Sequence, residues 1–312
     1  MRAAIRFLVF ALLLGALPAH ATVYYVAIAG IGGESDYEQR FNALIKDVSK
    51  TLQESSNVKV YALSGADATR ARVTEVMGQL ASQARPQDDF LLLLIGHGTF
   101  DGVEYKLNLV GPDLSGEDLA NLCNRIPAKR QVVVNTTSAS GGSLAALQKP
   151  GRGVIAATKS GTEKNATVFA RYWVEALRDA NADVDKNEAI SALEAFQYAT
   201  RKTADFYESQ KRLATEHAVF DDTGKNAEGV RAASTETGEG MLLSSFTLLR
   251  IGAAQMAAAD PDKRELFDKK EELERKIDTL KYQKAAMADD DYRRELTAAL
   301  LELARVQQEL DK

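Results

Sequence analysis

Five short apolar runs, rich in β-branched residues, constrain the fold of this chain more than any other feature. A longer amphipathic segment separates each run from the next, and the runs are apolar on both faces. Strands covered on both faces have this pattern, and their alternation with helices is typical of a parallel sheet. The expected strands are residues 23–29, 58–63, 90–96, 130–135 and 153–159. We therefore predict an α/β fold with a doubly wound, mostly parallel sheet and helices on both faces.

The segments between these runs have the periodicity of amphipathic helices. We expect helices over residues 37–54, 69–83, 115–125, 142–147 and 167–180, and a longer one over 190–213. Residues 227–240 are rich in Gly, Ser, Thr and Glu and predict a flexible loop, whereas residues 241–259 predict an apolar helix, or a strand followed by a helix. The single cysteine, Cys123, repeats with Leu119 and Ile126 on a helical apolar face, so we expect it to be buried and unable to form an intramolecular disulfide.

The C-terminal segment, residues 261–312, carries a heptad-like apolar stripe with one interruption. The stripe consists of Leu266, Leu273, Ile277, Leu280 and Met287, followed by Leu296, Leu300, Leu303, Val306 and Leu310. The acidic run at 288–291 separates the two halves, which predicts an antiparallel, coiled-coil-like α-helical hairpin. Each half is short for a free coiled coil, so we expect the stripe to contact the main domain, a second copy of the chain or another protein.

The first residues have the pattern of a cleaved secretory signal. Two arginines accompany a short apolar stretch, Phe7–Leu17, and Ala19-His20-Ala21 is a small-residue cleavage site. The apolar stretch is short for a membrane span, and retention as an amphipathic anchor is the alternative. We therefore expect the mature chain to begin at Thr22 and to be periplasmic or secreted.

These patterns divide the chain into four segments. They are a signal peptide (1–21), an α/β domain (22–226), a loop with an apolar element that packs on this domain (227–260), and the hairpin (261–312). The net charge of −5 and the pI near 5.5 provide no basic field for nucleic acid. No apolar run after the signal is long enough to cross a membrane. We therefore expect neither a nucleic-acid partner nor a membrane span after cleavage of the signal.

Two of the expected strands end in residues that can carry chemistry. The stretch "LLLLIGHGTF" (91–100) places His97 between two glycines, and "QVVVNTTSASGGS" (131–143) ends in small hydroxylated residues and glycines. In doubly wound sheets, ligands bind beyond the carboxyl ends of the strands. We therefore expect His97 and the loop 136–143 to share one crevice, although a histidine at a strand end can also simply hydrogen-bond a loop carbonyl.

The two motifs together resemble those of the caspase and legumain clan of cysteine peptidases, most closely bacterial legumain-like (peptidase C13-like) proteins. In that clan a His-Gly pair follows the third strand, and a Cys-x-Ser-Gly pattern follows the fourth. His97-Gly98 matches the first, and "SASG" (138–141) matches the second with Ser138 in the place of the cysteine. The resemblance covers roughly residues 23–225. It implies a caspase-like fold, with His97 and Ser138 at the clan's catalytic positions.

The resemblance also implies a crevice formed by Gly98, Ser140, Gly141 and Gly142, whose amides would hold an oxyanion. A serine is a poor nucleophile without a base in direct contact, whereas a thiol ionises near neutral pH. One interpretation is therefore an exported pseudo-peptidase that binds or scaffolds a peptide or protein. The alternative is an active hydrolase in which His97 serves Ser138 or a neighbouring threonine. The hydroxyl cluster can also be a helix N-cap.

A second motif, "DVDKNEAISALE" (183–194), is similar to a twelve-residue calcium loop. Asp183, Asp185, Asn187 and Glu194 occupy positions 1, 3, 5 and 12, which supply oxygen ligands for a hard cation. Position 6, where the sharp turn requires glycine, is Glu188. Calcium is therefore the one cofactor that the sequence suggests, and an acidic helix start is the alternative interpretation.

Overall fold

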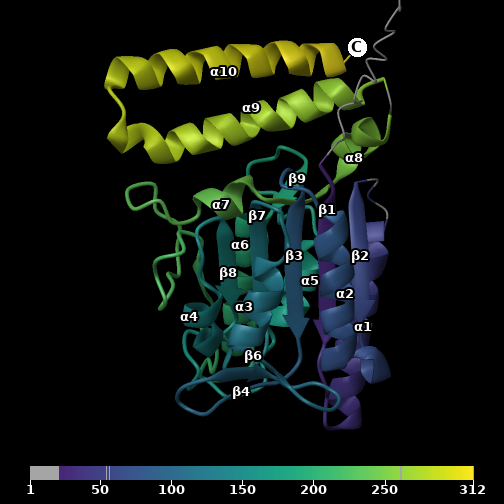
Figure 1. Cartoon of the computed structure of the whole chain (residues 1–312). Coiled ribbons are helices and arrows are strands. Elements are labelled where there is room, and N and C mark those ends of the chain that lie inside the picture. Colours follow the sequence, from purple (N-terminus) through teal and green to yellow (C-terminus); the bar gives the residue numbers. More distant parts are fainter. Residues whose placement is uncertain (1–20, 54, 56, 261, 312) are drawn as a thin grey trace, which may run out of the picture.

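A six-stranded sheet forms the centre of the computed structural model, which describes residues 21–53, 55, 57–260 and 262–311. The sheet contains β1 (Val23–Ala29), β2 (Val58–Leu63), β3 (Asp89–Ile95), β7 (Arg130–Asn135), β8 (Arg152–Ala156) and β10 (Val219–Asp221). Their order is β10-β8-β7-β3-β1-β2, and only the edge strand β10 runs antiparallel to its neighbour (Figure 1). The predicted signal peptide, 1–21, lies outside the described residues except for Ala21.

Alternate residues of each central strand enter different cores, because successive side chains of a strand point to opposite faces. In β1, Tyr25 and Ala27 belong to the core on one face, and Tyr24 and Val26 belong to the core on the other. All seven residues of β1 are buried. This double burial explains why the strands appear in the sequence as continuous apolar runs.

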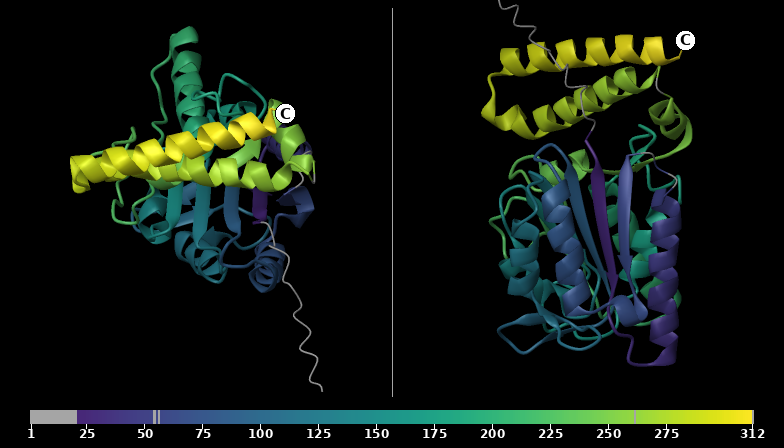
Figure 2. Two further views of the ribbon diagram at one scale, coloured as in Figure 1. Left: turned by 90° about the horizontal axis from the view of Figure 1, so that it is seen from above. Right: turned by 45° about the vertical axis from the view of Figure 1, so that its right-hand side comes forward.

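Two groups of helices cover the two faces (Figure 2). One core includes residues of α1 (Ser35–Gln53), α5 (Phe169–Ala176) and α6 (Ala192–Ser209). The other includes residues of α2 (Arg70–Gln83), α3 (Gly116–Asn124) and α4 (Leu144–Leu147). Cys123 is buried in the second core. The predicted α/β fold with helices on both faces is therefore confirmed.

Short additional strands lie at the two ends of the six-stranded sheet. At the carboxyl end, β4 (Gly98–Phe100), β5 (Tyr105–Leu107) and β6 (Leu114–Ser115) form an antiparallel sheet directly after β3. At the other end, β9 (Ala189–Ser191) pairs with β11 (Thr247–Arg250). Short 3-10 helices are η1 (Gly65–Asp67), η2 (Ser140–Ser143) and η3 (Lys284–Ala286).

Several element boundaries differ by a few residues from the sequence-based expectation, and two of these differences have a clear local reason. The helix expected from 190 begins at Ala192, because Ser191 and Glu194 form a capping box there and the residues before it form β9. The acidic run 288–291 does not break the hairpin; instead Asp289–Asp291 are the first turn of α10 (Asp289–Leu310). Carboxylates are favourable at the positive end of a helix dipole. The break lies at η3, directly before this run.

The C-terminal hairpin lies across the amino end of the sheet (Figure 1). After β11, the chain forms α8 (Gly252–Ala259), α9 (Arg264–Gln283) and α10, and α7 (Met241–Ser245) precedes β11. Helix α9 packs on α7 and α8, and α10 packs on α9. The predicted helical hairpin is therefore present, with α9 between the main domain and α10.

Much of the apolar stripe is covered within the chain itself. Leu273, Ile277, Leu280 and Val306 of the stripe are buried, as are Phe267 and Ala299 beside it. Leu300 and Leu301 of α10 remain exposed. The chain itself therefore covers only part of the stripe, and association through 261–312 stays a prediction. Among the described helices, none has the length and apolar character of a membrane span.

Candidate functional site

His97 lies at the carboxyl end of β3, where the backbone turns sharply. Gly96, before it, has φ 139°, and a Cβ at Gly96 would lie 3.1 Å from the backbone nitrogen of Gly30. Glycine is required here because the loops after β1 and β3 touch each other. This close approach directs the His97 side chain toward the loop after β1 and toward α1.

The His97 imidazole is packed among aromatic side chains. Its ring centroid lies 4.7 Å from that of Tyr37 and 5.3 Å from that of Phe41, both with edge-to-face geometry. Burial lowers the pKa of His97, although a backbone hydrogen bond with Gly32 acts in the opposite direction. The imidazole is therefore held on the α1 side of the site. No hydrogen bond joins His97 to Ser138, both of which the structure describes.

Ser138 lies at the carboxyl end of the neighbouring strand, as expected, but its hydroxyl is already engaged. The N–H of Gly98 donates to Ser138 Oγ at 3.1 Å, and this hydroxyl donates to the Gly98 carbonyl at 3.0 Å. The side chain is buried, with 3% of its residue surface exposed. Both hydrogen-bonding roles of the hydroxyl are thus used by one neighbouring residue. A nucleophile would have to break these bonds before it could attack.

The other hydroxyls of the loop are also bonded internally. Thr136 donates to the Leu94 carbonyl, Thr137 donates to Asn135, Ser140 bonds with Thr158, and Ser143 donates to the Ser140 carbonyl. Neither Ser140 nor Ser143 caps the following helix with its side chain. The cluster therefore serves to satisfy buried polar groups, which would be costly to leave unpaired.

The backbone N–H groups of the glycines, which the resemblance assigned to an oxyanion, also donate hydrogen bonds within the protein. Gly98 N–H donates to Ser138, Gly141 N–H donates to Thr158 Oγ1 at 2.9 Å, and Gly142 N–H donates to the Ala139 carbonyl at 3.0 Å. The structure brings these glycines together, but their donors point into the loop. An oxyanion would have to displace a protein acceptor at each of them.

The glycines are also covered by neighbouring groups. A Cβ at Gly142 would lie 2.6 Å from the Phe100 ring, and a Cβ at Gly161 would lie 2.3 Å from it. A Cβ at Gly141 would lie 2.3 Å from the backbone nitrogen of Ser160. The ring of Phe100 and the turn at 160–161 thus pack directly on this loop.

An imidazole–carboxylate pair borders the same loop and was not found from the sequence. His217 Nδ1 lies 2.5 Å from Glu163 Oε1, and the backbone N–H of His217 donates to Glu163 Oε2 at 3.1 Å. The Glu163 carbonyl accepts the N–H of Ala139, which has a left-handed φ of 56°. Glu163 therefore connects the segment before β10 to the residue next to Ser138.

The acidic loop lies at the opposite end of the sheet, beside the hairpin. Carboxylate oxygens of Asp183, Asp185 and Glu194 lie within 4.8 Å of one another, so these three residues could hold a metal ion. Asp183 also accepts the N–H groups of Asn187 and Glu188. Burial, and then the charge of Glu194, raise the pKa of Asp185 to about 6. A cation bound there would relieve this repulsion.

Two residues of this loop bear on its similarity to a calcium loop. Glu188 has a left-handed φ of 66°, the conformation that normally makes glycine necessary at position 6. The side-chain oxygen of Asn187, Oδ1, accepts the N–H of Ala189 at 2.8 Å, and its side-chain amide donates to Asp185 Oδ2 at 3.3 Å. The structure thus brings the three predicted carboxylate ligands together, with Asn187 hydrogen-bonded to two of them.

Comparisons with known proteins give matches among solved structures alone. No protein-family model and no curated protein matches the chain. Among solved structures, the Drosophila initiator caspase Dronc aligns with a TM-score of 0.41 and 13% identity over 67% of this chain and 81% of the caspase. The protein GSU0716 from Geobacter sulfurreducens aligns with a TM-score of 0.43 and 13% identity over 65% of this chain and 93% of its own. Similarity at this level does not extend to activity.

Proposed function

We propose that the chain is an exported pseudo-peptidase of the caspase and legumain type, which binds a peptide or protein at the carboxyl end of its sheet without cleaving it. The observation that carries this proposal is the double hydrogen bond between Ser138 and Gly98. It occupies both the hydroxyl that would attack and an amide that would stabilise the oxyanion. His97, which would be the base, packs against Tyr37 and Phe41 instead.

A binding role is consistent with the side chains that remain accessible at the carboxyl end of the sheet. The side chains of His97, Phe100 and His217 are all partly exposed there. Aromatic and imidazole groups provide apolar area together with a polar edge, which suits recognition of a peptide. The hydrolase alternative would require the Ser138 hydroxyl to leave Gly98 and reach His97.

The proposal can be tested with a panel of synthetic extended tetrapeptides. Nuclear magnetic resonance would follow the amide signals of Gly98, Gly141 and Ala139 during titration, and mass spectrometry would examine the peptides afterwards. We expect saturable shifts with at least one peptide and no cleavage. Cleavage that disappears in Ser138→Ala would establish the hydrolase instead. If no peptide of the panel shifts these amide signals, the proposed peptide binding at the carboxyl end of the sheet is wrong.

Calcium binding by the acidic loop is a second proposed function, favoured by the left-handed Glu188. That residue gives the loop the turn for which calcium loops normally use glycine. Asp183, Asp185 and Glu194 would hold the ion through carboxylate oxygens, the ligand type that calcium prefers. The bound cation would order the loop, which contributes β9 and the cap of α6.

A further inference from the structure

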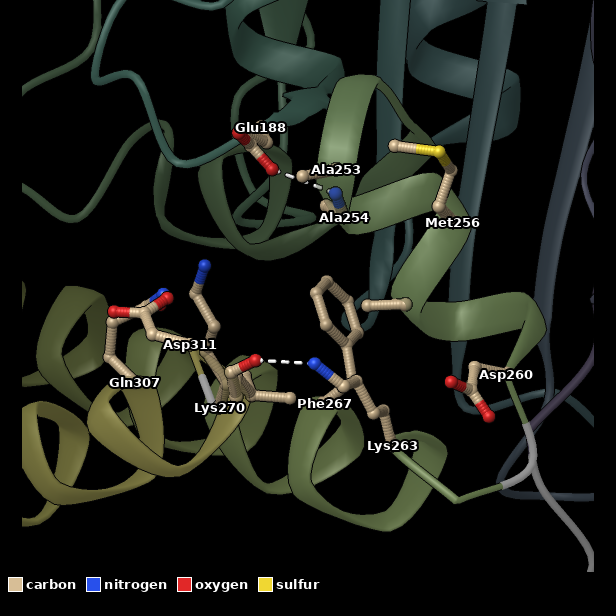
Figure 3. A pocket seen from close by; sticks show the side chains of 12 residues that line it. Glu188, Ala253, Ala254, Met256, Asp260, Lys263, Phe267, Lys270, Gln307 and Asp311 are labelled. Carbon is tan, nitrogen blue, oxygen red and sulfur yellow. Dashed lines mark hydrogen bonds between the residues drawn. The ribbon is translucent and has the colours of Figure 1, made fainter.

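A cavity separates α8 from the hairpin at the amino end of the sheet (Figure 3). Its volume is about 300 Å³. That volume equals roughly ten water molecules in the liquid, and it lies at the lower end of the range for small-molecule sites. The apolar part of the lining consists of Ala253, Ala254, Met256, Ala257, Phe267 and Leu310.

Lys270 of α9 points into this cavity beside the ring of Phe267 (Figure 3). Its side chain is 13% exposed, and its ammonium lies 5.6 Å from the Phe267 ring centroid. In the described part of the chain its ion-pair partner is Glu274, at 3.8 Å, which is beyond hydrogen-bond distance. An ammonium carries three donors, so a largely buried lysine with this environment offers unused hydrogen-bonding capacity.

The other polar groups of the lining are already bonded. Lys263 Nζ donates to the Leu310 carbonyl at 2.7 Å, Gln307 donates to Asp311 at 2.8 Å, and Glu188 Oε2 accepts the N–H of Ala254 at 2.7 Å. Asp260 accepts the N–H of Asp262 at 3.0 Å. The lining therefore combines an apolar wall with three carboxylates and two ammonium groups, of which Lys270 has no hydrogen bond within the described residues.

We propose that this cavity binds a small amphiphile with a carboxylate on an aliphatic chain of about eight carbons, a size set by the cavity volume. The carboxylate would accept hydrogen bonds from Lys270, and the chain would lie against the alanines of α8 and the ring of Phe267. Such a ligand would contact α8, α9 and α10 together. It would consequently strengthen the attachment of the hairpin to the main domain.

Octanoate is a suitable probe for the mature full-length chain, used below its micellar concentration. We expect octanoate to raise the melting temperature in a saturable manner. Acetate lacks the chain, octanol lacks the charge and octylamine reverses the charge, so all three should be clearly weaker. If octanol or octylamine stabilises the protein as well as octanoate does, the proposed recognition of a carboxylate is wrong.

Two variants test whether the rise in melting temperature comes from octanoate bound in the cavity. Lys270→Met retains a long apolar stem and removes the charge, so the affinity for octanoate should fall at least about tenfold, which corresponds to about 1.4 kcal/mol. Ala257→Leu leaves the lysine intact but fills the cavity, and it should also abolish the response. Exposed Lys281→Met on the same helix is the control and should bind like the wild type. Unchanged octanoate binding in both cavity variants would overturn the proposal.

Discussion

Arg250 of β11 and Glu271 of α9 form a bidentate ion pair that joins the hairpin to the main domain. Arg250 Nε and Nη2 each lie 2.6 Å from an oxygen of Glu271, and both side chains are 11% exposed. Arg250 also stacks over the Phe267 ring, 5.2 Å from its centroid. Parallel charge-assisted bonds of this kind fix an orientation as well as adding energy.

Glu271→Gln is therefore expected to loosen the hairpin. Removing one partner of a largely buried pair leaves the other charge uncompensated and typically costs about 3 to 5 kcal/mol. Hydrogen exchange of the α9 and α10 amides should accelerate while the central strands stay protected. Glu302→Gln, which breaks the exposed Lys269 pair, is the matched control and should change little. Equal exchange in the two variants would contradict this role for Arg250 and Glu271.

The free energy of unfolding should decrease as the pH rises, because of Glu274. Burial raises the pKa of Glu274 to about 7 from an ordinary value of 4.5, and Glu271, Asp185 and Asp278 add repulsion while Lys270 opposes it. The folded state then holds a proton that the unfolded state releases, so stability falls between about pH 4.5 and pH 7. The loss should be about 3 kcal/mol, since each pKa unit between the folded and unfolded values corresponds to about 1.4 kcal/mol. In urea denaturation, the free energy of unfolding should fall less with rising pH for Glu274→Gln than for the wild type. An identical pH profile in the two proteins would count against this role for Glu274.

Two glycine substitutions should have opposite effects on stability. Gly141→Ala places a Cβ 2.3 Å from the Ser160 backbone nitrogen, so we expect a loss of about 1 to 3 kcal/mol from overpacking. Gly78 lies within α2 with nothing within 4 Å of its added Cβ. Gly78→Ala should therefore stabilise the protein by about 0.5 to 1 kcal/mol, since alanine favours a helix. Chemical denaturation of both variants measures the difference.

Calcium at millimolar concentration should raise the melting temperature by mass action on the folded state. Asp183→Asn should abolish this shift, because it removes one of the three grouped carboxylates. Asp290→Asn, in the exposed first turn of α10, should leave the shift intact. No shift in the wild type, or an equal shift in Asp183→Asn, would exclude the acidic loop as a calcium site.

The strands and helices could be predicted because their patterns are local. The apolar run around Val26 reflects burial on both faces, and the spacing of Leu273, Ile277 and Leu280 reflects the buried face of α9. The location of His97 and Ser138 at the same end of the sheet followed from the parallel direction of their strands. These inferences require no knowledge of which side chains touch.

The bonds within the site could not be predicted, because they join residues distant in sequence. Gly98 and Ser138 are 40 positions apart, and Glu163 and His217 are 54 apart. Only the folded chain brings these pairs together. A motif specifies residue types at a strand end, whereas the bonded partners of a hydroxyl depend on the packing of several loops.

The central claim is that Ser138 is structural and not a nucleophile, and labelling with a fluorophosphonate tests it most directly. These reagents react with a serine hydroxyl that a base has activated. Intact-protein and peptide mass spectrometry of the wild type, with His97→Ala as the control, would locate any adduct. We predict no adduct at Ser138 in either protein. Stoichiometric labelling of Ser138 in the wild type that disappears in His97→Ala would contradict the account.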